Sequence, residues 1–486
     1  MRLSKLINKG TSTLRQDWTN VEIKGLSADS RNVRPGYLFA AIPGNLADGR
    51  NYIDAAIAAG ASAILAPTGT KQPISNENIP FITDINPRQS LAHMAARFFG
   101  KQPENVVAVT GTNGKTSVAH FAQQLWTLAG AKAASLGTLG VTGPGYPARG
   151  GLTTPGPVAL QKTLSDLKVD QCDHLCIEAS SHGLDQNRID GVRIKAAAFT
   201  NLSRDHLDYH KTFNAYRDAK FRLFRELLCE GGTVVANAET NEAETLQQIA
   251  NNRSLKFISY GLDVGDICLE SRKLTPNGWS LKLRAFNTLY EAELSLPGAF
   301  QVVNIIAAMG LLHACGAAIS ELVALLPKLK SVPGRMQKVG ITAAGGKVYV
   351  DYAHTPDALN TALQSVRLHT VNKLVVVFGC GGDRDRGKRP QMGTIACNLA
   401  DTAIITDDNP RSENPAMIRS EIMAACNDAT EIADREQAIK TAIGLIGPGD
   451  TLVIAGKGHE TGQTIDNKVY PFDDFEVASA ALRETK

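Results

Sequence analysis

The stretch AVTGTNGKTS, residues 108–117, joins an apolar run to a helical pattern and decides the fold. Gly111 and Gly114 allow backbone N–H groups to curl around phosphate oxygens, and the start of the following helix adds positive potential. Lys115 can neutralise β- and γ-phosphates, and Thr116 can ligate Mg²⁺. The usual pattern has about four residues between its glycines, whereas this loop has a shorter spacer. The strand–loop–helix context is kept, so the sequence predicts a nucleotide-phosphate site.

Polar residues follow two later apolar runs. Glu178 ends one of these runs, at a place where an unpaired carboxylate would be unfavourable. The segment TNLSRDHLDYH, residues 200–210, follows the other and contains Asp205, His206, Asp208 and His210. A turn cap at Glu178 and an ordinary polar loop at residues 200–210 are the alternatives. Because ligands in α/β sheets bind at the carboxyl ends of strands, we expect both segments to share the phosphate-loop site.

Strand-like runs alternate with helical patterns along the chain. Strands are expected at residues 36–43, 61–66, 106–110, 348–352, 373–378, 402–406 and 451–455, and helices at residues 51–59 and 89–99. This alternation is typical of parallel sheets covered on both faces. The segment SVPGRM, residues 331–336, has the Pro and Gly of a linker. We therefore predict three α/β domains, at residues 1–88, 89–332 and 333–486.

The composition argues against several classes of protein. The chain has 486 residues with 51 Lys and Arg against 48 Asp and Glu, a net charge of +3, and no basic cluster that would predict nucleic-acid binding. The start lacks the apolar run of a signal peptide, and the longest apolar stretch, residues 305–319, is too short to span a bilayer. The eight cysteines show no paired C-x-x-C spacing. We therefore expect neither zinc nor a disulfide framework, no membrane insertion, and a cytoplasmic protein.

A series of motifs occurs in a recognisable order. They are GTNGKTS, EASSHGL, FTNLSRDHLDYH, the helix around Lys220, GRM, DYAHTPDAL, GCGGDRDRGKRP, DDNPRSENP and GKGHE. With these motifs the chain resembles the Mur ligase family, which builds the peptide of bacterial peptidoglycan. The resemblance runs over residues 27–475. It implies an N-terminal UDP-binding α/β domain, a central P-loop ATPase α/β domain and a C-terminal Rossmann-like α/β domain.

Within that family, the resemblance implies an enzyme that adds meso-2,6-diaminopimelate to the γ-carboxylate of D-glutamate in UDP-MurNAc-L-Ala-D-Glu. ATP first phosphorylates the carboxylate, and the amine then attacks the acyl phosphate. Because a carboxylate attacking ATP meets like-charge repulsion, such a site needs cations. The implied catalytic residues are Lys115, Lys220, Glu178 and His206. The implied cofactors are Mg²⁺, held by Thr116, Glu178, His206 and Lys220, and a CO₂-derived carbamate on Lys220.

The resemblance also assigns the binding residues. For ATP these are Gly111, Thr112, Asn113, Gly114, Lys115, Thr116, Ser117, Asn304, Arg335 and Asp351. For the UDP-MurNAc-peptide they are Ala28, Ser30, Asn45, Leu46, Ala47, Thr153, Thr154, Ser180, Gln186 and Arg188. Two positions depart from the family pattern. Asn45-Leu46 stands where His-Gln is often found, and Gln301 stands where Asn is often found near the adenine, which leaves the role of Gln301 open.

The amino-acid donor depends on a charged pocket. Meso-diaminopimelate has a distal carboxylate beside an ammonium, so a selective pocket needs a cation for the first and an acceptor for the second. Arg411 can grip the carboxylate as a bidentate fork. The implied diaminopimelate set is Arg384, Asp408, Asn409, Pro410, Arg411, Gly456 and Glu460. A turn-capping role for Arg411 is the alternative, and lysine-adding relatives lack this Arg.

Three other functions compete with this hypothesis. An L-lysine-adding ligase of the family would share most motifs, and a folylpolyglutamate synthase would lack the UDP-domain motifs and DNPR. A P-loop nucleotide switch or transport ATPase would need switch loops or a partner surface. We expect a monomer that binds small-molecule substrates and no nucleic acid, with a hinge near residues 332–334 that closes the C-terminal domain onto the central one.

Overall fold

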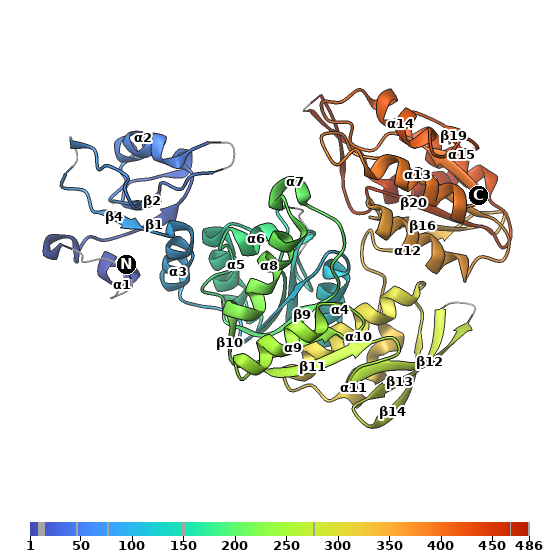
Figure 1. The fold of residues 1–486 in the computed structure, drawn as a ribbon, viewed down its shortest axis with the longest axis horizontal. Helices are drawn as coiled ribbons and strands as arrows, with labels where there is room; N and C mark the ends of the chain where they lie inside the picture. The colour runs from blue at the N-terminus through green and yellow to red at the C-terminus, as the bar shows by residue number, and fades with distance from the viewer. Residues whose placement is uncertain are drawn as a thin grey trace.

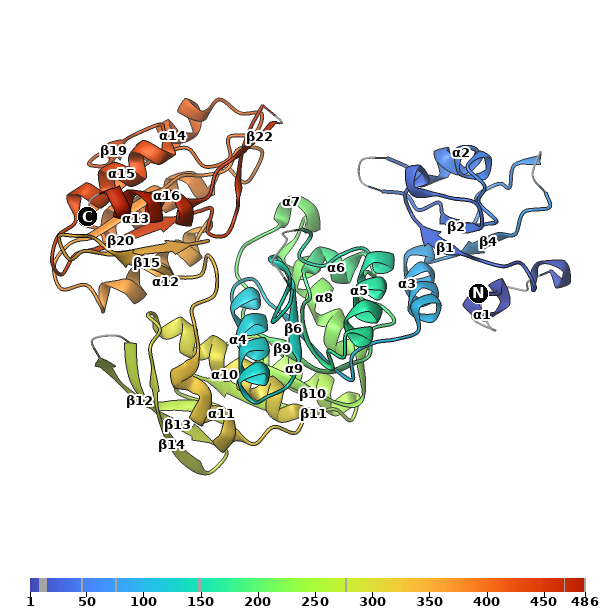
Figure 2. The ribbon, with the colours of Figure 1, turned by 180° about the vertical axis from the view of Figure 1, so that it is seen from behind.

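The computed structural model describes residues 1–7, 15–44, 47–74, 77–146, 151–275, 278–466 and 468–484. Figure 1 shows the blue N-terminal part and the orange-red C-terminal part on opposite sides of the green and yellow central part, and Figure 2 shows the same order from behind. Each part has its own sheet. The prediction of an α/β fold with three domains is confirmed in its class, while the exact domain boundaries stay a prediction.

The N-terminal sheet is parallel, with strand order β1-β2-β3-β4 in the described residues. Its strands are β1 (Gly25–Ser27), β2 (Tyr37–Ala40), β3 (Ala63–Pro67) and β4 (Phe81–Asp84), and its helices are α1 (Leu3–Leu6), α2 (Ile53–Ala58) and α3 (Pro87–Phe99). Helix α3 begins with Pro87 in its first turn and is capped by the Asn86 side chain, which accepts a hydrogen bond from Gln89 N–H. Gly100, which has a left-handed φ of 72°, follows its last residue as the C-cap.

The central sheet has the strand order β14-β13-β12-β11-β10-β9-β5-β8-β6-β7 in the described residues. Its strands are β5 (Asn105–Thr110), β6 (Ala133–Gly137), β7 (Gly140–Thr142), β8 (His174–Glu178), β9 (Ile194–Phe199), β10 (Leu228–Asn237), β11 (Lys256–Gly261), β12 (Ile267–Thr275), β13 (Gly278–Ala285) and β14 (Thr288–Leu294). Its helices are α4 (Lys115–Leu128), α5 (Pro157–Val169), α6 (Ser181–Asp185), α7 (Leu207–His210), α8 (Phe213–Arg222), α9 (Ala243–Asn252), α10 (Ala299–Ala314) and α11 (Ile319–Leu325).

Strand β5 shows why this sheet is covered on both faces. Val107 and Val109 belong to one apolar cluster, which also contains Phe121 of α4, while Val106 and Ala108 belong to another on the opposite face. Successive side chains of a strand point to opposite faces, so an unbroken apolar run is what a doubly covered strand requires. The phosphate loop therefore leaves the sheet from a central, fully buried strand.

The C-terminal sheet has the order β15-β16-β20-β17-β18-β19 in the described residues, beside a β21–β22 hairpin. The strands are β15 (Gln337–Ile341), β16 (Lys347–Asp351), β17 (Leu374–Phe378), β18 (Thr402–Ile405), β19 (Thr430–Glu431), β20 (Thr451–Ala455), β21 (Gly462–Ile465) and β22 (Lys468–Pro471). The helices are α12 (Pro356–Arg367), α13 (Lys388–Leu399), α14 (Pro415–Met423), α15 (Arg435–Leu445) and α16 (Asp474–Glu484).

The expectation of parallel sheets is wrong at the sheet edges. Strands β6 and β7, β12 to β14, and β15 and β16 pair antiparallel. The turn between β13 and β14 consists of Phe286 and Asn287, and such a short connection cannot form the crossover that parallel strands need. The β12–β14 extension makes the central sheet much wider than the sequence pattern suggests.

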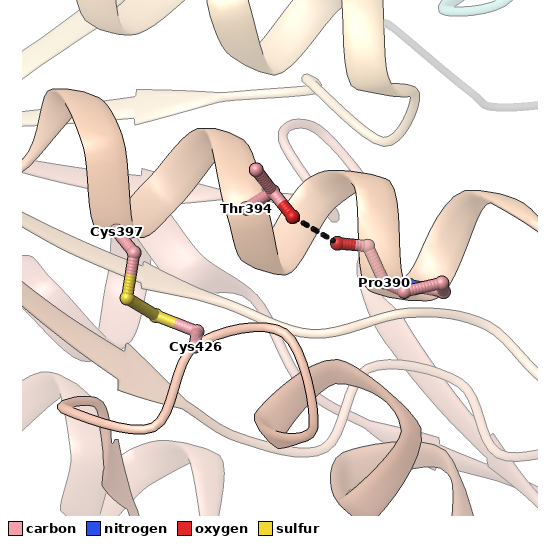
Figure 3. The surroundings of a disulfide bond; sticks show 4 residues. All are labelled: Pro390, Thr394, Cys397 and Cys426. Carbon is pink, nitrogen blue, oxygen red and sulfur yellow. Dashed lines mark hydrogen bonds between the residues drawn. A yellow bond between two sulfur atoms is a disulfide. The ribbon is translucent and has the colours of Figure 1, made fainter.

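The expectation of no disulfide framework is corrected at one pair of cysteines. Cys397 of α13 is bonded to Cys426, which follows α14, with their Cα atoms 5.6 Å apart (Figure 3). The two cysteines are 29 residues apart in sequence, so no local spacing reveals them. The packing of α14 against α13 brings them together. No helix in the described part of the chain is long and apolar enough to cross a membrane.

Candidate active site

A cavity of about 380 Å³ lies where the central and C-terminal domains meet. Its walls come from the carboxyl ends of β5, β8, β9 and β16, which is where parallel α/β sheets place ligands. The predicted residues that line it are Thr112, Asn113, Gly114, Lys115, Thr116, Ser117, Thr153, Glu178, Ser180, Asp205, His206, Lys220, Asn304, Arg335 and Asp351. The structure thus brings the predicted metal and catalytic residues into one space with the predicted nucleotide residues, except Gly111, which is not among the lining residues.

The phosphate loop requires its two glycines. Gly111 has φ 146°, and a Cβ atom there would lie 1.9 Å from the Thr200 hydroxyl oxygen. Gly114 has φ 88°, and a Cβ atom there would lie 2.5 Å from Asn304 Oδ1. The backbone N–H of Asn113 donates to Asn201 Oδ1 at 2.9 Å, which holds the shortened loop against the end of β9. The loop therefore still delivers the N-terminus of α4 to the cavity.

Two lysines share one acceptor in this loop. Lys115 Nζ donates to the carbonyl oxygen of Gly111 at 2.8 Å, and Lys220 Nζ donates to the same oxygen at 2.7 Å. Lys220 is 1% exposed, and its Nζ lies 4.4 Å from the centre of the Tyr216 ring. Burial, and then the charge of Lys115, push the pKa of Lys220 well below its usual value. Burial also lowers the pKa of Lys115.

Glu178 faces the phosphate loop from the end of β8. Its Oε2 accepts hydrogen bonds from the hydroxyl groups of Thr116, at 3.0 Å, and Thr138, at 3.2 Å. Its Oε1 accepts the backbone N–H of Thr138 at 3.0 Å. A Cβ atom at Gly137 would lie 2.0 Å from Oε1, so a glycine is needed beside this carboxylate. Glu178 both caps the Thr138 turn and joins the cavity, so the two sequence interpretations describe one position.

The segment after β9 contributes only part of its polar residues. Asp205 and His206 line the cavity, whereas Asp208 and His210 are not among its lining residues. The His206 side chain is 44% exposed, and its Nε2 lies 3.4 Å from Asp205 Oδ2. Desolvation in the pocket outweighs the Asp205 charge and lowers the pKa of His206 to about 4. The imidazole is therefore neutral at pH 7 and can act as a ligand.

The linker and the third domain close the nucleotide side. Arg335 donates to the Thr116 hydroxyl at 3.3 Å, and its guanidinium carbon lies 4.4 Å from the centre of the Tyr352 ring. The Gln301 amide donates to the Arg335 carbonyl at 3.3 Å, and its oxygen accepts from Asn304 at 3.2 Å. Gln301 is not among the residues that line the cavity. Its side chain therefore joins α10 to the linker, and its role at the adenine stays an open question.

The predicted peptide-binding residues of the central domain form a network. The Thr154 hydroxyl contacts the Ser180 hydroxyl at 2.9 Å, and Arg188 donates to the Thr154 carbonyl at 2.8 Å. Arg188 also donates to Gln186 Oε1 at 2.7 Å. The Thr153 hydroxyl, which lines the cavity, contacts the Thr138 hydroxyl at 3.0 Å. Ala28, Ser30 and Ala47 lie on the N-terminal domain, away from this network, and Asn45 and Leu46 lie outside the described residues.

The predicted diaminopimelate residues form a separate cluster on the C-terminal domain. They follow β17, β18 and β20, and Asn409 Nδ2 donates to Glu460 Oε2 at 2.8 Å. Arg411 has φ 53° and donates to the Gly382 carbonyl at 2.7 Å. The members outside the cavity lining are Arg384, Asp408, Asn409, Pro410, Arg411, Gly456 and Glu460. In this conformation the amino-acid cluster and the phosphate loop are therefore not one site.

Two polar contacts bridge the domains beside the cavity. Asn113 of the phosphate loop donates to Asp357 Oδ2 of α12 at 3.0 Å, and a guanidinium nitrogen of Arg204 lies 3.6 Å from Asp385 Oδ2.

Sequence reasoning missed Asp357 and Thr138, and it also missed Lys457, which lies inside the GKGHE motif. Thr138 follows an apolar run, the signal that identified Glu178. In the described part of the chain, no group of three or more His, Cys, Asp and Glu side chains has the geometry of a metal site.

The cavity and its surroundings place the chain in a class of nucleotide-dependent ligases. Three family models match it: the Mur ligase family catalytic domain at residues 22–99, the Mur ligase middle domain at residues 109–312, and the Mur ligase glutamate ligase domain at residues 334–458. The chain belongs to the Mur ligase family.

Relatives within the family agree over almost the whole length. The chain is 48% identical to the UDP-N-acetylmuramoyl-L-alanyl-D-glutamate--2,6-diaminopimelate ligase of Mesorhizobium japonicum, with 96% of each chain covered. It is 47% identical to the ligase of the same name from Rhizobium meliloti, over 97% of this chain and 96% of the relative. A solved structure with that name is similar at a TM-score of 0.73 and 33% identity, covering 100% of this chain and 99% of the other.

Proposed function

We propose that the chain uses ATP to add meso-2,6-diaminopimelate to the D-glutamate γ-carboxylate of UDP-MurNAc-L-Ala-D-Glu, as a cytoplasmic monomer in peptidoglycan synthesis, and so supports cell shape and division. The relatives named above carry the substrate and the amino acid in their names. The single observation that carries the chemistry is the shared cavity, in which Lys115, Lys220, Glu178 and Thr116 meet at the phosphate loop.

The cations of the cavity explain the first step. A γ-carboxylate that attacks ATP brings negative charge towards negative charge, so the barrier falls when fixed cations surround the phosphates. Lys115 projects from the first turn of α4, where its ammonium can move from the Gly111 carbonyl to a phosphate oxygen. Arg335 reaches Thr116 from the linker and adds a second positive charge. The carboxylate becomes an acyl phosphate, and ADP is the leaving group.

Lys220 fits the proposed carbamate. Its pKa is pushed down by burial and by Lys115, so the neutral amine that reacts with CO₂ is favoured. A carbamate is an anion, so the repulsion between Lys220 and the neighbouring Lys115 would become an attraction. The Tyr216 ring and the Gly111 carbonyl hold the lysine in place.

The oxygen donors in the cavity fit Mg²⁺. This ion prefers oxygen ligands, and the Thr116 hydroxyl and the Glu178 carboxylate lie 3.0 Å apart. We propose that these two groups, the neutral His206 imidazole and the Lys220 carbamate would hold it. Bound Mg²⁺ would offset the phosphate charge.

The second step needs the two domains to approach. The acyl phosphate would form in the cavity, while the amino-acid cluster lies outside it on the C-terminal domain. We propose that the linker near residues 332–334 rotates and brings the amine to the acyl carbon. The tetrahedral intermediate then expels phosphate and leaves the new amide.

The direct test is phosphate release with UDP-MurNAc-L-Ala-D-Glu, ATP and Mg²⁺, comparing meso-diaminopimelate with L-lysine. Release with diaminopimelate alone, together with a tripeptide product, is expected. Release with lysine alone would keep the ligase and change its donor. Release that needs no amino acid would favour the nucleotide-switch alternative.

A further inference from the structure

The cluster after β18 and β20 contains a fully buried lysine that the proposed chemistry leaves unused. We infer that Lys457 is a positioning residue for the amino-acid site: it anchors one oxygen of Glu460, so that the other oxygen is aimed at an ammonium of the amino-acid substrate. This inference rests on the proposed function and adds to it a residue that determines specificity.

The Lys457 ammonium is entirely used within the protein. Its Nζ donates to the Gly462 carbonyl at 2.6 Å, to Asn409 Oδ1 at 3.2 Å and to Glu460 Oε2 at 3.2 Å. The residue is 0% exposed. An ammonium has three N–H donors, and these three acceptors account for all of them. Lys457 therefore has no donor left for a ligand, and its charge acts through its neighbours.

Asn409 belongs to the same hydrogen-bond network, which joins Lys457, Asn409 and Glu460 and is called the Glu460 brace below. Its Oδ1 accepts hydrogen bonds from Lys457 and from the backbone N–H of Thr464, at 2.9 Å, and its Nδ2 donates to Glu460 Oε2 at 2.8 Å. Asn409 follows β18, and Thr464 belongs to the β21–β22 hairpin. The Asn409 side chain thus ties a strand end to the hairpin. Its Oδ1 already accepts two hydrogen bonds, so the side chain holds Glu460 in place through Nδ2.

Glu460 is the member of the cluster that can receive a ligand. Its Oε2 accepts from both Lys457 and Asn409, while its Oε1 receives no hydrogen bond from any residue that the structure describes. Its side chain is 32% exposed, in contrast to the buried lysine. A carboxylate fixed at one oxygen presents the other in a set direction. An ammonium beside the distal carboxylate of a diamino acid would be recognised there.

The position of Arg411 relative to Glu460 bears on which amino acid the site selects. Its backbone N–H donates to the Thr464 carbonyl at 3.0 Å, so the same hairpin supports both the proposed carboxylate fork and the Glu460 brace. A diamino acid with a distal carboxylate and a distal ammonium would use both groups. L-2-aminopimelate has the carboxylate without that ammonium, so it would use Arg411 alone.

The test compares Lys457→Met with the wild-type chain. We expect the KM for meso-diaminopimelate to rise about tenfold, with the KM values for ATP and UDP-MurNAc-dipeptide unchanged, since one charged contact is worth about that factor. The KM for L-2-aminopimelate should stay unchanged, so the preference for the diamino acid falls about tenfold. Lys457→Arg keeps the charge and should restore part of the preference.

Arg367→Met is the matched control. Its guanidinium binds Asp401 and the Leu399 carbonyl at the amino ends of the strands, opposite the amino-acid cluster. It should lower thermal stability and leave the preference intact. Because Lys457 acts through Glu460, adding Lys457→Met to Glu460→Gln should cause no further loss of preference.

The outcomes separate the inference from the function on which it rests. An equal KM increase for both amino acids, or additive losses in the double variant, would overturn the positioning role of Lys457 while leaving the ligase in place. A wild-type chain that releases no phosphate with meso-diaminopimelate would overturn the proposed function itself, and the inferred ligand with it.

Discussion

Lys115 and Lys220 donate hydrogen bonds to the same carbonyl oxygen, that of Gly111, at 2.8 and 2.7 Å. Two ammonium groups bound to one oxygen repel each other, and burial leaves little water to screen them. Either one lysine is neutral or one of them is converted to an anion. Burial pushes the pKa of Lys220 well below its usual value, and its side chain is 1% exposed, so we propose that Lys220 is the residue that changes.

The first prediction concerns Lys220. Lys220→Ala should reduce phosphate release by roughly a hundredfold or more, because the site loses a proposed ligand for the metal that offsets transition-state charge. Lys211→Ala is the control, since this lysine is exposed and its ammonium donates to the Asp208 carbonyl. In ¹³C-bicarbonate, the wild-type chain should give a carbamate carbon signal that Lys220→Ala lacks. Full activity in that variant would remove Lys220 from the mechanism.

A second prediction concerns the donor. Arg411→Ala should raise the KM for meso-diaminopimelate by roughly ten- to a hundredfold and leave any weak use of L-lysine unchanged, because lysine has no distal carboxylate for the guanidinium to bind. Arg386→Ala is the control. The exposed Arg386 side chain binds Glu413, which lies in the same loop as Arg411. Unchanged incorporation of diaminopimelate would leave Arg411 as a turn residue that supports Gly382.

The proposed hinge supplies a third prediction. Gly334 has φ 65°, and a Cβ atom there would lie 2.4 Å from the His459 backbone nitrogen. Gly334→Ala should therefore displace the linker from the GKGHE loop, lower kcat about tenfold and weaken the change in small-angle scattering caused by an ATP analogue with UDP-dipeptide. Gly316→Ala also has a positive φ, of 100°, but its Cβ would meet nothing within 4 Å. It should cost about 1 kcal/mol of stability and leave the scattering change intact.

The sequence predicted residues whose signal is local. The strand before the phosphate loop, its glycines and Glu178 were accessible because a buried strand reads as an unbroken apolar run that ends in a polar residue. The pairing of Cys397 with Cys426 could not be predicted, because it depends on packing between segments that are distant in sequence. The bonds of Lys457 could not be predicted either, because they depend on how a hairpin packs. Physical reasoning from the residues also gave no role to Lys220, which resembles an ordinary helical lysine. Its assignment came from the family resemblance.

A fourth prediction concerns the disulfide. Closing a loop of 29 residues should stabilise the folded chain by about 3–4 kcal/mol in the chain-entropy model. A reductant should therefore lower the thermal midpoint of the wild-type chain, whereas Cys397→Ser should show a low midpoint with or without it. Cys229→Ser, at a free cysteine, is the control. A reductant-insensitive wild type would show that the two thiols stay reduced, as the proposed cytoplasmic location favours.

The last prediction follows from Asp351 at the end of β16. Its carboxylate accepts the backbone N–H groups of Met336, at 2.6 Å, and Ala353, at 2.8 Å, but burial outweighs these bonds and raises its pKa from 3.8 to about 6. Below pH 3.8 the group is protonated in both the folded and unfolded chain. Between pH 3.8 and 6 only the folded chain keeps the proton, so the unfolded chain binds fewer protons and stability falls as the pH rises.

The free energy of unfolding of the wild type, relative to Asp351→Asn, should therefore fall by about 2 kcal/mol between pH 4 and 6 and level off above pH 7. Asp450 is the matched control, because it also accepts two backbone N–H groups, those of Gly447 and Lys373, and these lower its pKa. The wild type relative to Asp450→Asn should gain stability as the pH rises through about 4 and then stay level. Opposite slopes for two carboxylates with the same kind of backbone partners would identify burial as the cause at Asp351. Parallel slopes would mean that the Asp351 carboxylate is ionised well below pH 6.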